Sequence, residues 1–174
     1  MASDETWQKV RQHFRPDSDI DNWGDASAID DELLLVLFDF RVWIGVPIYV
    51  LWGTNGKHGT DSFHYVQNGA CAVDIAIPDY PKTPIDLLLD VFRFDFRGVG
   101  FYPDWKYNGK PAKGLHLDRR PLKWDPDHTK NYRENRWLGV KGTEGQVYLP
   151  FTFENINKHT RGNQWNSSQN FGLT

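Results

Sequence analysis

The chain of 174 residues is 39% hydrophobic and 15% aromatic, which is enough apolar material for one folded domain with its own core. Its formal net charge of −3 at pH 7 gives no support for a nucleic-acid partner, because such proteins usually carry a basic excess. The single cysteine, Cys71, excludes an intrachain disulfide and a structural zinc site built from several thiolates.

The N-terminal residues and the apolar stretches bear on where the protein acts. Residues 1–5 are polar and acidic, unlike a secretory signal peptide. The longest apolar stretches, 33–38 and 42–52, are too short or too interrupted to span a bilayer. We therefore predict a protein without a signal peptide or membrane insertion. It would be made in the cytoplasm and reach an external target by lysis or within an assembled particle.

The first predicted elements follow an irregular segment. Residues 1–27 mix charge with aromatic side chains in no clean period, which indicates an arm with one short helix. Acidic residues at 30–32, followed by apolar residues at helical spacing, predict a buried helix that ends near Gly45. The β-branched and aromatic segment 47–52 predicts a strand, and the glycine-containing segment 53–60 predicts a loop.

The middle of the chain combines strands with one more helix. Strands are predicted over 72–77, 98–102 and 114–118, and a helix is predicted over 86–94. One further strand is predicted over 146–153, in a region otherwise rich in tryptophan, asparagine and charge. These elements predict an α+β fold, with a small antiparallel sheet and helices packed on one of its faces.

We divide the chain into an N-terminal arm (1–27), a core (28–125) and a C-terminal extension (126–174). The extension ends in a polar stretch over 158–174, which is typical of an extended or partner-bound tail. Four tryptophans could line a saccharide-binding groove, although packing is the more general use of this residue: Trp105, Trp124, Trp137 and Trp165.

Two histidines and an aspartate carry the strongest functional signal: His64, Asp74 and His116. Two neutral imidazoles and one carboxylate can hold a divalent transition metal and still leave a position open for water, as a catalytic zinc requires. His58 is an alternative first ligand. Zinc is inferred from the ligand types, and manganese or iron suits the same set. The two-residue period of a strand places Asp118 on the same face as His116.

Five short motifs follow one another along the core. They are R-V-W-I-G-V-P-I at 41–48, S-F-H at 62–64, A-V-D at 72–74, G-V-G-F-Y at 98–102 and H-L-D-R-R at 116–120. In this order the chain resembles the M15 zinc peptidases, the D-Ala-D-Ala carboxypeptidase and L-Ala-D-Glu endopeptidase families, whose fold hedgehog signalling domains share. The resemblance covers about residues 33–124. Each motif alone is weak, but their order and spacing together are fairly specific.

The resemblance implies that His64, Asp74 and His116 are the zinc ligands, with water or the scissile carbonyl oxygen in the fourth position. For the general base it leaves two candidates, Asp118 and, second, Asp104 in the turn before. A carboxylate near the metal could accept the proton of the attacking water and pass it to the leaving amine. Asp118 could equally orient a ligand histidine.

The chain departs from the family pattern around these ligands. Ten positions separate His64 from Asp74, about three more than in the family, and a surface insertion of this size costs little closure entropy. The family's substrate-binding arginine is missing, and Lys57 is the nearest cation, without the two-pronged geometry of arginine. Lys113 stands where several branches carry an acid.

Two further residues complete the candidate substrate site. Arg119 could bind an acidic group of the substrate, although an arginine beside an aspartate at a strand end more often forms a surface ion pair. Ser62, in the S-F-H motif, is the other candidate.

Three functional hypotheses follow. The first is a zinc metallopeptidase that cuts the stem peptide of bacterial peptidoglycan, as a phage lysin or a virion-borne hydrolase. The second is a structural phage-particle component that uses the fold as an interaction module and meets other virion proteins through its arm and tail. The third is a metal-binding recognition domain without catalysis. Fold resemblance alone does not separate them.

Overall fold

The computed structural model describes residues 1–55, 61–121 and 135–160. In this part of the chain the helices are α1 (Asp4–Val10), α2 (Asp31–Ile44), α3 (Pro84–Val91) and α4 (Phe153–Thr160). The strands are β1 (Tyr49–Trp52), β2 (Ala72–Ile77), β3 (Gly98–Tyr102), β4 (Lys106–Tyr107), β5 (Lys110–Pro111), β6 (Lys113–Asp118), β7 (Asn135–Lys141) and β8 (Gln146–Pro150). Two short 3-10 turns, η1 (Ala26–Ala28) and η2 (Val66–Asn68), complete the elements.

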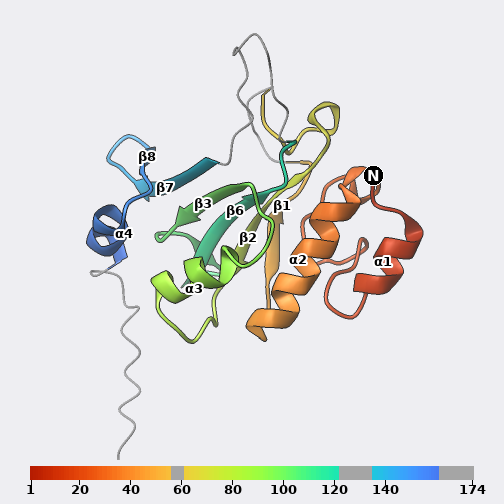
Figure 1. The fold of residues 1–174 in the computed structure, drawn as a ribbon, viewed down its shortest axis with the longest axis horizontal. Coiled ribbons are helices and arrows are strands. Elements are labelled where there is room, and N and C mark those ends of the chain that lie inside the picture. The colour runs from red at the N-terminus through yellow and green to blue at the C-terminus, as the bar shows by residue number, and fades with distance from the viewer. Residues whose placement is uncertain (56–60, 122–134, 161–174) are drawn as a thin grey trace, which may run out of the picture.

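A six-stranded sheet in the order β1-β2-β6-β3-β7-β8 forms the centre, and β4 and β5 pair separately. Helices α2 and α3 lie in front of this sheet, α1 lies beside α2, and α4 lies near β7 and β8 (Figure 1). The predicted α+β class is confirmed. The sheet was predicted to be antiparallel, but it is mixed, because β3 and β7 run parallel. Parallel strands are joined by a long connection and not by a short hairpin, so no local turn pattern in the sequence predicts that they pair.

Local signals explain the two helices that had been predicted. The side chain of Asp30 accepts a hydrogen bond from the backbone N–H of Leu33 at 2.8 Å and caps α2, which ends at Gly45 in the left-handed conformation (φ 69°). Pro84 opens α3, inside a reciprocal cap formed by Thr83 and Asp86. The expected helix over 86–94 therefore exists, but it starts and ends earlier than predicted.

The core lies between α2 and the helix-facing side of the sheet. Many of its fully buried members come from α2 and the three central strands: Leu33, Leu34, Leu37, Phe40, Val73, Ile75, Phe101, Leu115 and Leu117. The segment 1–27 also contributes, because Trp7, Phe14 and Trp23 are buried, with Trp7 and Phe14 edge-on to Trp23. The residues predicted to form an arm thus pack into the same hydrophobic core.

Residues 135–160, in the predicted extension, add β7, β8 and α4 to this architecture. The strand predicted over 146–153 corresponds to β8, whereas β7 and α4 were not predicted. The polar tail at 161–174 lies outside the described residues.

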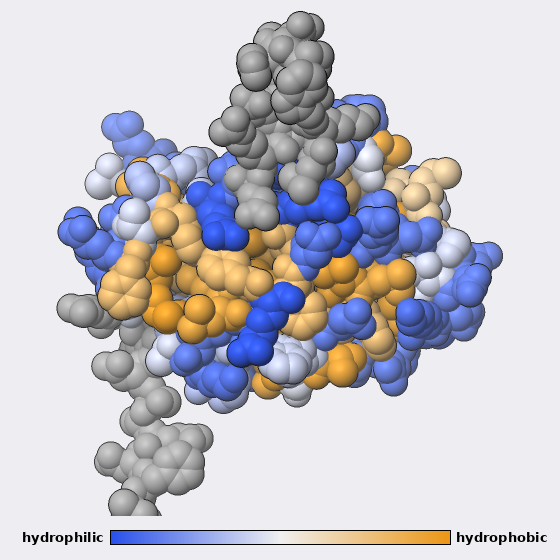
Figure 2. Space-filling view, in the orientation of Figure 1, coloured by the Kyte–Doolittle hydropathy of each residue, from blue (hydrophilic) through white to orange (hydrophobic). Residues whose placement is uncertain are grey.

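The face of the molecule that carries α2 and α3 has hydrophobic residues gathered across its middle (Figure 2). Exposed apolar side chains on these helices and just after α3 include Val42, Trp43, Leu89 and Phe92. No helix within 1–55, 61–121 and 135–160 is long and apolar enough to cross a membrane.

The opposite face of the sheet is built differently, because glycines stand at the centre of its strands. A Cβ atom at Gly100 would lie 2.5 Å from the ring of Trp137, and one at Gly114 would collide with the ring of Trp105. Glycine at these positions lets aromatic side chains lie flat on the sheet. This face also carries the candidate metal ligands.

Candidate metal centre

The structure brings the three predicted ligands together. Asp74 on β2 and His116 on β6 are directly paired across neighbouring strands, and His64 comes from the loop between β1 and β2. One ligand atom from each residue lies within 4.8 Å of the others. The group could therefore hold a metal ion.

The ligand atoms converge on one point. Nδ1 of His116 lies 2.9 Å from Oδ1 of Asp74 and 3.2 Å from Nε2 of His64. Nε2 of His64 lies 3.6 Å from Oδ2 of Asp74. The side chain of His116 is 12% exposed, that of Asp74 is 8% exposed and that of His64 is 1% exposed, so the centre is shielded from bulk water.

Each histidine is oriented by a partner on its other ring nitrogen. Nδ1 of His64 donates to the carbonyl oxygen of Gly53 at 2.7 Å, and Nε2 of His116 donates to Oδ2 of Asp118 at 3.1 Å. A carbonyl or carboxylate oxygen can only accept, so these nitrogens carry the hydrogens. By the same argument Nδ1 of His116 carries a hydrogen toward Oδ1 of Asp74 in the metal-free protein. Metal binding would release that hydrogen, after which Nε2 of His64 and Nδ1 of His116 would present lone pairs to the centre.

The electrostatics of the centre come from two carboxylates on either side of His116. Burial by itself would raise the pKa of Asp74, but hydrogen bonds from His116 and His64 outweigh it and hold that pKa well below its usual range. Burial would lower the pKa of His116, but Asp118 and Asp74 outweigh it and raise that pKa to about 9. In the metal-free centre the two carboxylates therefore favour the protonated, positively charged form of His116.

Asp118 is fully buried, and its carboxylate lies between His116 and Arg120. Nε of Arg120 donates to Oδ1 of Asp118 at 2.8 Å, and the backbone N–H of Arg120 donates to the same oxygen at 3.0 Å. A Cβ atom at Gly98 would collide with this carboxylate, so glycine makes room for it. Burial would raise the pKa of Asp118, but hydrogen bonds from Arg120 and His116 outweigh it and keep that pKa low. The arrangement suits an orienting carboxylate.

Replacing Asp118 by asparagine is expected to weaken metal binding roughly 10- to 100-fold, the usual cost of losing an orienting partner of a ligand histidine. The amide keeps the shape of the side chain but loses the negative charge that faces Nε2 of His116. Competition with a chromophoric chelator measures the affinity, with Asp95→Asn as the control at an exposed carboxylate. Unchanged affinity together with lost hydrolysis would instead assign Asp118 as the general base.

Lys113 occupies the position where an acid had been expected from the resemblance, and it faces the other side of the sheet. Its Nζ donates to the carbonyl oxygen of Tyr80 at 2.9 Å, and the side chain is buried. Burial lowers the pKa of Lys113 from 10.5 to about 8. The residue belongs to the core side of β6, away from the face that carries His116.

Lys113→Met is expected to stabilise the protein at pH 7. The folded-state pKa of about 8 lies below the unfolded value of 10.5, so the charged lysine costs about 3 kcal/mol below pH 8. Loss of the hydrogen bond to Tyr80 offsets about 1 kcal/mol of this gain. The wild type should gain stability as the pH rises from 8 towards 10.5, and the variant should lack this rise. Urea unfolding at pH 7.0 and 9.5 tests this, with Lys106→Met on β4 as the exposed control.

The candidate substrate residues lie in different places. Ser62 is next to the centre, where its Oγ accepts a hydrogen bond from the backbone N–H of His64 at 3.3 Å. Arg119 pairs with Glu32 at 2.7 Å and with Asp95 at 2.6 Å, as the surface ion-pair interpretation predicts.

The remaining candidates are farther from the ligands or cannot be placed. Oδ2 of Asp104 accepts from the backbone N–H of Lys141 at 3.0 Å, which links the turn after β3 to β7. Lys57 and the alternative ligand His58 lie outside the described residues, as do Trp124 and Trp165.

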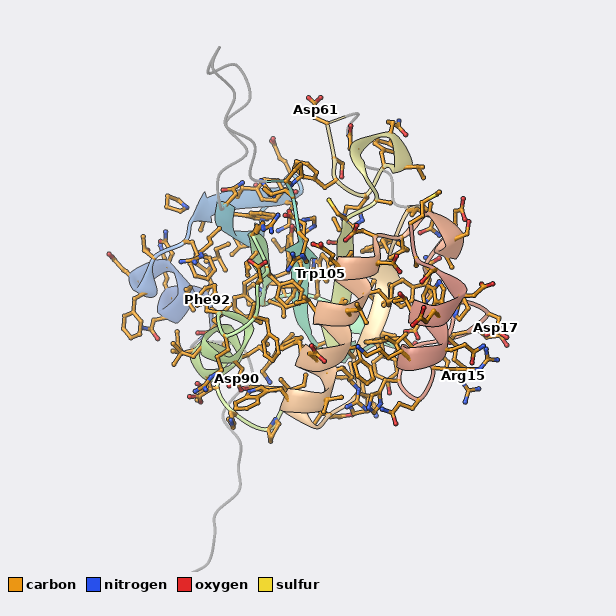
Figure 3. All side chains as sticks on the ribbon, turned by 45° about the vertical axis from the view of Figure 1, so that its right-hand side comes forward. Arg15, Asp17, Asp61, Asp90, Phe92 and Trp105 are labelled. Atoms are coloured by element: carbon orange, nitrogen blue, oxygen red, sulfur yellow. The ribbon has the colours of Figure 1, made fainter. Side chains whose placement is uncertain are left out.

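Aromatic side chains flank the centre. Two of them, Trp105 and Trp137, were predicted to serve either a saccharide-binding groove or packing, with no link to the metal ligands. The ring of Trp137 lies 5.0 Å from the ring of His116, and its Nε1 donates to the hydroxyl of Tyr102 at 3.0 Å. Trp105 stacks on Tyr102 at 4.3 Å and lies near the middle of the molecule (Figure 3), and Trp52 meets it edge-on. The glycines of the G-V-G motif were the available signal, since they leave space on this face.

We compared the chain with protein-family models, curated proteins and solved structures, and none of them matches it.

Proposed function

We propose that this protein is a zinc-dependent peptidase that hydrolyses a peptide bond in bacterial cell-wall peptidoglycan, as a phage lysin or a virion-associated hydrolase. The observation that carries the proposal is the convergence of His64, Asp74 and His116 within 4.8 Å. Two imidazole nitrogens and one carboxylate are the donor set of a catalytic zinc, which keeps one position for water or substrate. The five M15-like motifs support peptidoglycan as the substrate.

The chain's own residues would hold the metal and orient its ligands. The donor atoms would be Nε2 of His64, a carboxylate oxygen of Asp74 and Nδ1 of His116. The carbonyl oxygen of Gly53 and the carboxylate of Asp118 fix the orientation of the two imidazole rings. Bound zinc would supply Lewis acidity to a carbonyl oxygen and acidify water. The aromatic residues beside His116 would exclude water from one side of the substrate and offer flat apolar surface to it.

A non-catalytic role in a phage particle is the second candidate. Both proposed bases already have partners within the protein. The carboxylate of Asp118 is paired with Arg120, and that of Asp104 accepts a hydrogen bond from the backbone N–H of Lys141. In addition, β8 lies at the edge of the sheet and exposes Tyr148, which suits contact with another virion protein. In that case the metal would stabilise the fold of an interaction module.

Digestion of purified peptidoglycan separates the two candidates. The wild-type protein, its chelator-treated form and the form reloaded with zinc are incubated with peptidoglycan, and released amino groups are measured. Release that is lost on chelation and restored by zinc supports the peptidase, and mass spectrometry of the fragments identifies the bond. Stoichiometric zinc without any release supports the interaction module instead.

A further inference from the structure

A cavity of about 330 Å³ lies between the segment after α1, the C-terminal half of α2 and the start of β1. This volume is at the lower end of the range for small-ligand sites. Its charged and aromatic lining residues are Arg11, His13, Arg15, Asp21, Arg41 and Tyr49. Basic groups therefore dominate this cavity, although the chain as a whole is acidic.

The three guanidinium groups lack carboxylate partners in the described part of the chain. No carboxylate oxygen there lies within 4.0 Å of Arg11, Arg15 or Arg41. Arg41 is half-buried, and burial lowers its pKa, as expected for a cation without a counter-charge. Other arginines of this protein do have such partners, Arg120 with Asp118 for example. The cavity thus carries positive charge that this part of the chain leaves uncompensated.

One acid also lines the cavity and sets its net charge. The Oδ1 atom of Asp21 accepts a hydrogen bond from the backbone N–H of Val50 at 3.0 Å, which ties this carboxylate to β1. Three guanidinium groups and one carboxylate give the lining a formal net charge of +2. Neutral donors are present as well, because Gln12 and Ser18 line the same cavity. The hydroxyl oxygen of Ser18 accepts hydrogen bonds from the backbone N–H groups of Ile20 and Asp21. The hydroxyl hydrogen of Ser18 is therefore left for another acceptor.

We propose that this cavity binds a phosphate group. A phosphate monoester carries about −1.5 to −2 charges at neutral pH, which matches the net charge of the lining. Arginine forks bind phosphate oxygens in pairs, and hydroxyl and amide donors complete such sites. The segment that carries Arg15 is anchored to β1, since the backbone N–H of Asn22 donates to the carbonyl oxygen of Val50 at 2.9 Å. The cavity is therefore held in shape by the fold.

The phosphate cavity is separate from the metal centre. Tyr49 at the start of β1 lines the cavity. Gly53, just beyond the other end of β1, accepts the hydrogen bond from Nδ1 of the metal-ligand candidate His64. Four residues of extended chain span about 13 Å. Arg15 lies beside α1, on the side of the molecule opposite Phe92 and α4 (Figure 3). The proposal is therefore independent of the proposed peptidase activity.

Isothermal titration calorimetry with inorganic phosphate tests the proposal. Wild-type protein should show saturable binding, and the exposed-residue double variant Arg11→Gln/Arg15→Gln should bind at least about tenfold more weakly. The matched control is Arg93→Gln, an exposed arginine that packs over Trp43. Far-UV circular dichroism verifies that the variants are folded. Equal binding by the double variant, or no saturable binding by the wild type, would overturn the proposal.

Two further arms fix the location and the ligand. Phosphate also binds zinc, so the titration is repeated on His116→Ala, which should bind phosphate as the wild type does. Loss of binding in that variant would place the anion at the metal centre and reject the cavity. Acetate at the same ionic strength should bind much more weakly, and equal binding would reject phosphate as the ligand. If glycerol 3-phosphate binds more tightly than inorganic phosphate, the natural ligand is an esterified phosphate. If inorganic phosphate binds more tightly, the natural ligand is the free anion.

Discussion

Replacing His116 by alanine is expected to remove the metal from the protein and to abolish peptide hydrolysis. The imidazole supplies one of three donor atoms, and its Nδ1 lies within 3.2 Å of both other donor groups. Loss of an orienting partner alone costs up to about 100-fold in metal affinity, so loss of the ligand itself should cost more. Metal content after dialysis, measured by mass spectrometry with inductively coupled plasma, gives the result.

The matched control is His159→Ala, which removes a histidine from α4 and should leave one metal per chain. Hydrolysis of peptidoglycan is measured on the same preparations. Full metal content in His116→Ala would overturn the ligand assignment. Lost metal with unchanged hydrolysis would overturn the proposed mechanism while leaving the metal centre in place.

Phe101→Ala is expected to cost about 3–5 kcal/mol of unfolding free energy. Phe101 is fully buried on β3, where it is paired with Leu115 of β6. Truncation leaves a cavity between the central strands and α2, and the close pairing of these strands limits how far the site can collapse. Because β6 also carries His116, the variant should hold its metal less tightly.

Urea unfolding monitored by tryptophan fluorescence measures this loss. Phe153→Ala is the control, because Phe153 on α4 is 69% exposed and should change stability by less than about 0.5 kcal/mol. A loss below about 1 kcal/mol for Phe101→Ala would show that the core can repack around this position.

Local signals in the sequence were sufficient for much of the core. The acids before α2 and Gly45 after it marked a helix that the structure contains, because helix caps act through neighbouring backbone groups. The strands over 72–77 and 114–118 were correctly placed from their composition and their period. The same period put His116 on one face with Asp118, as observed.

Pairings between distant segments could not be predicted in this way. Strand β7 joins β3 in parallel, and only this pairing brings Trp137 against His116. Neither composition nor period indicated that Arg119 would reach Glu32, which lies 87 positions away in the chain. Such contacts depend on how separate elements pack, and neither composition nor periodicity encodes that packing directly.

The sequence by itself therefore determined the α+β class, most of the central strands and the three candidate ligands. The class and the strands depend on residue type and on spacing within a few turns of the chain, whereas the ligand assignment depends on the motifs that carry the M15 resemblance. Only the tertiary structure decided that the ligand atoms converge, that Lys113 faces the core, and that Arg11, Arg15 and Arg41 line one cavity. These features require segments about 25 or more residues apart to meet. Burial and charge at such meeting points arise from the packed fold as a whole.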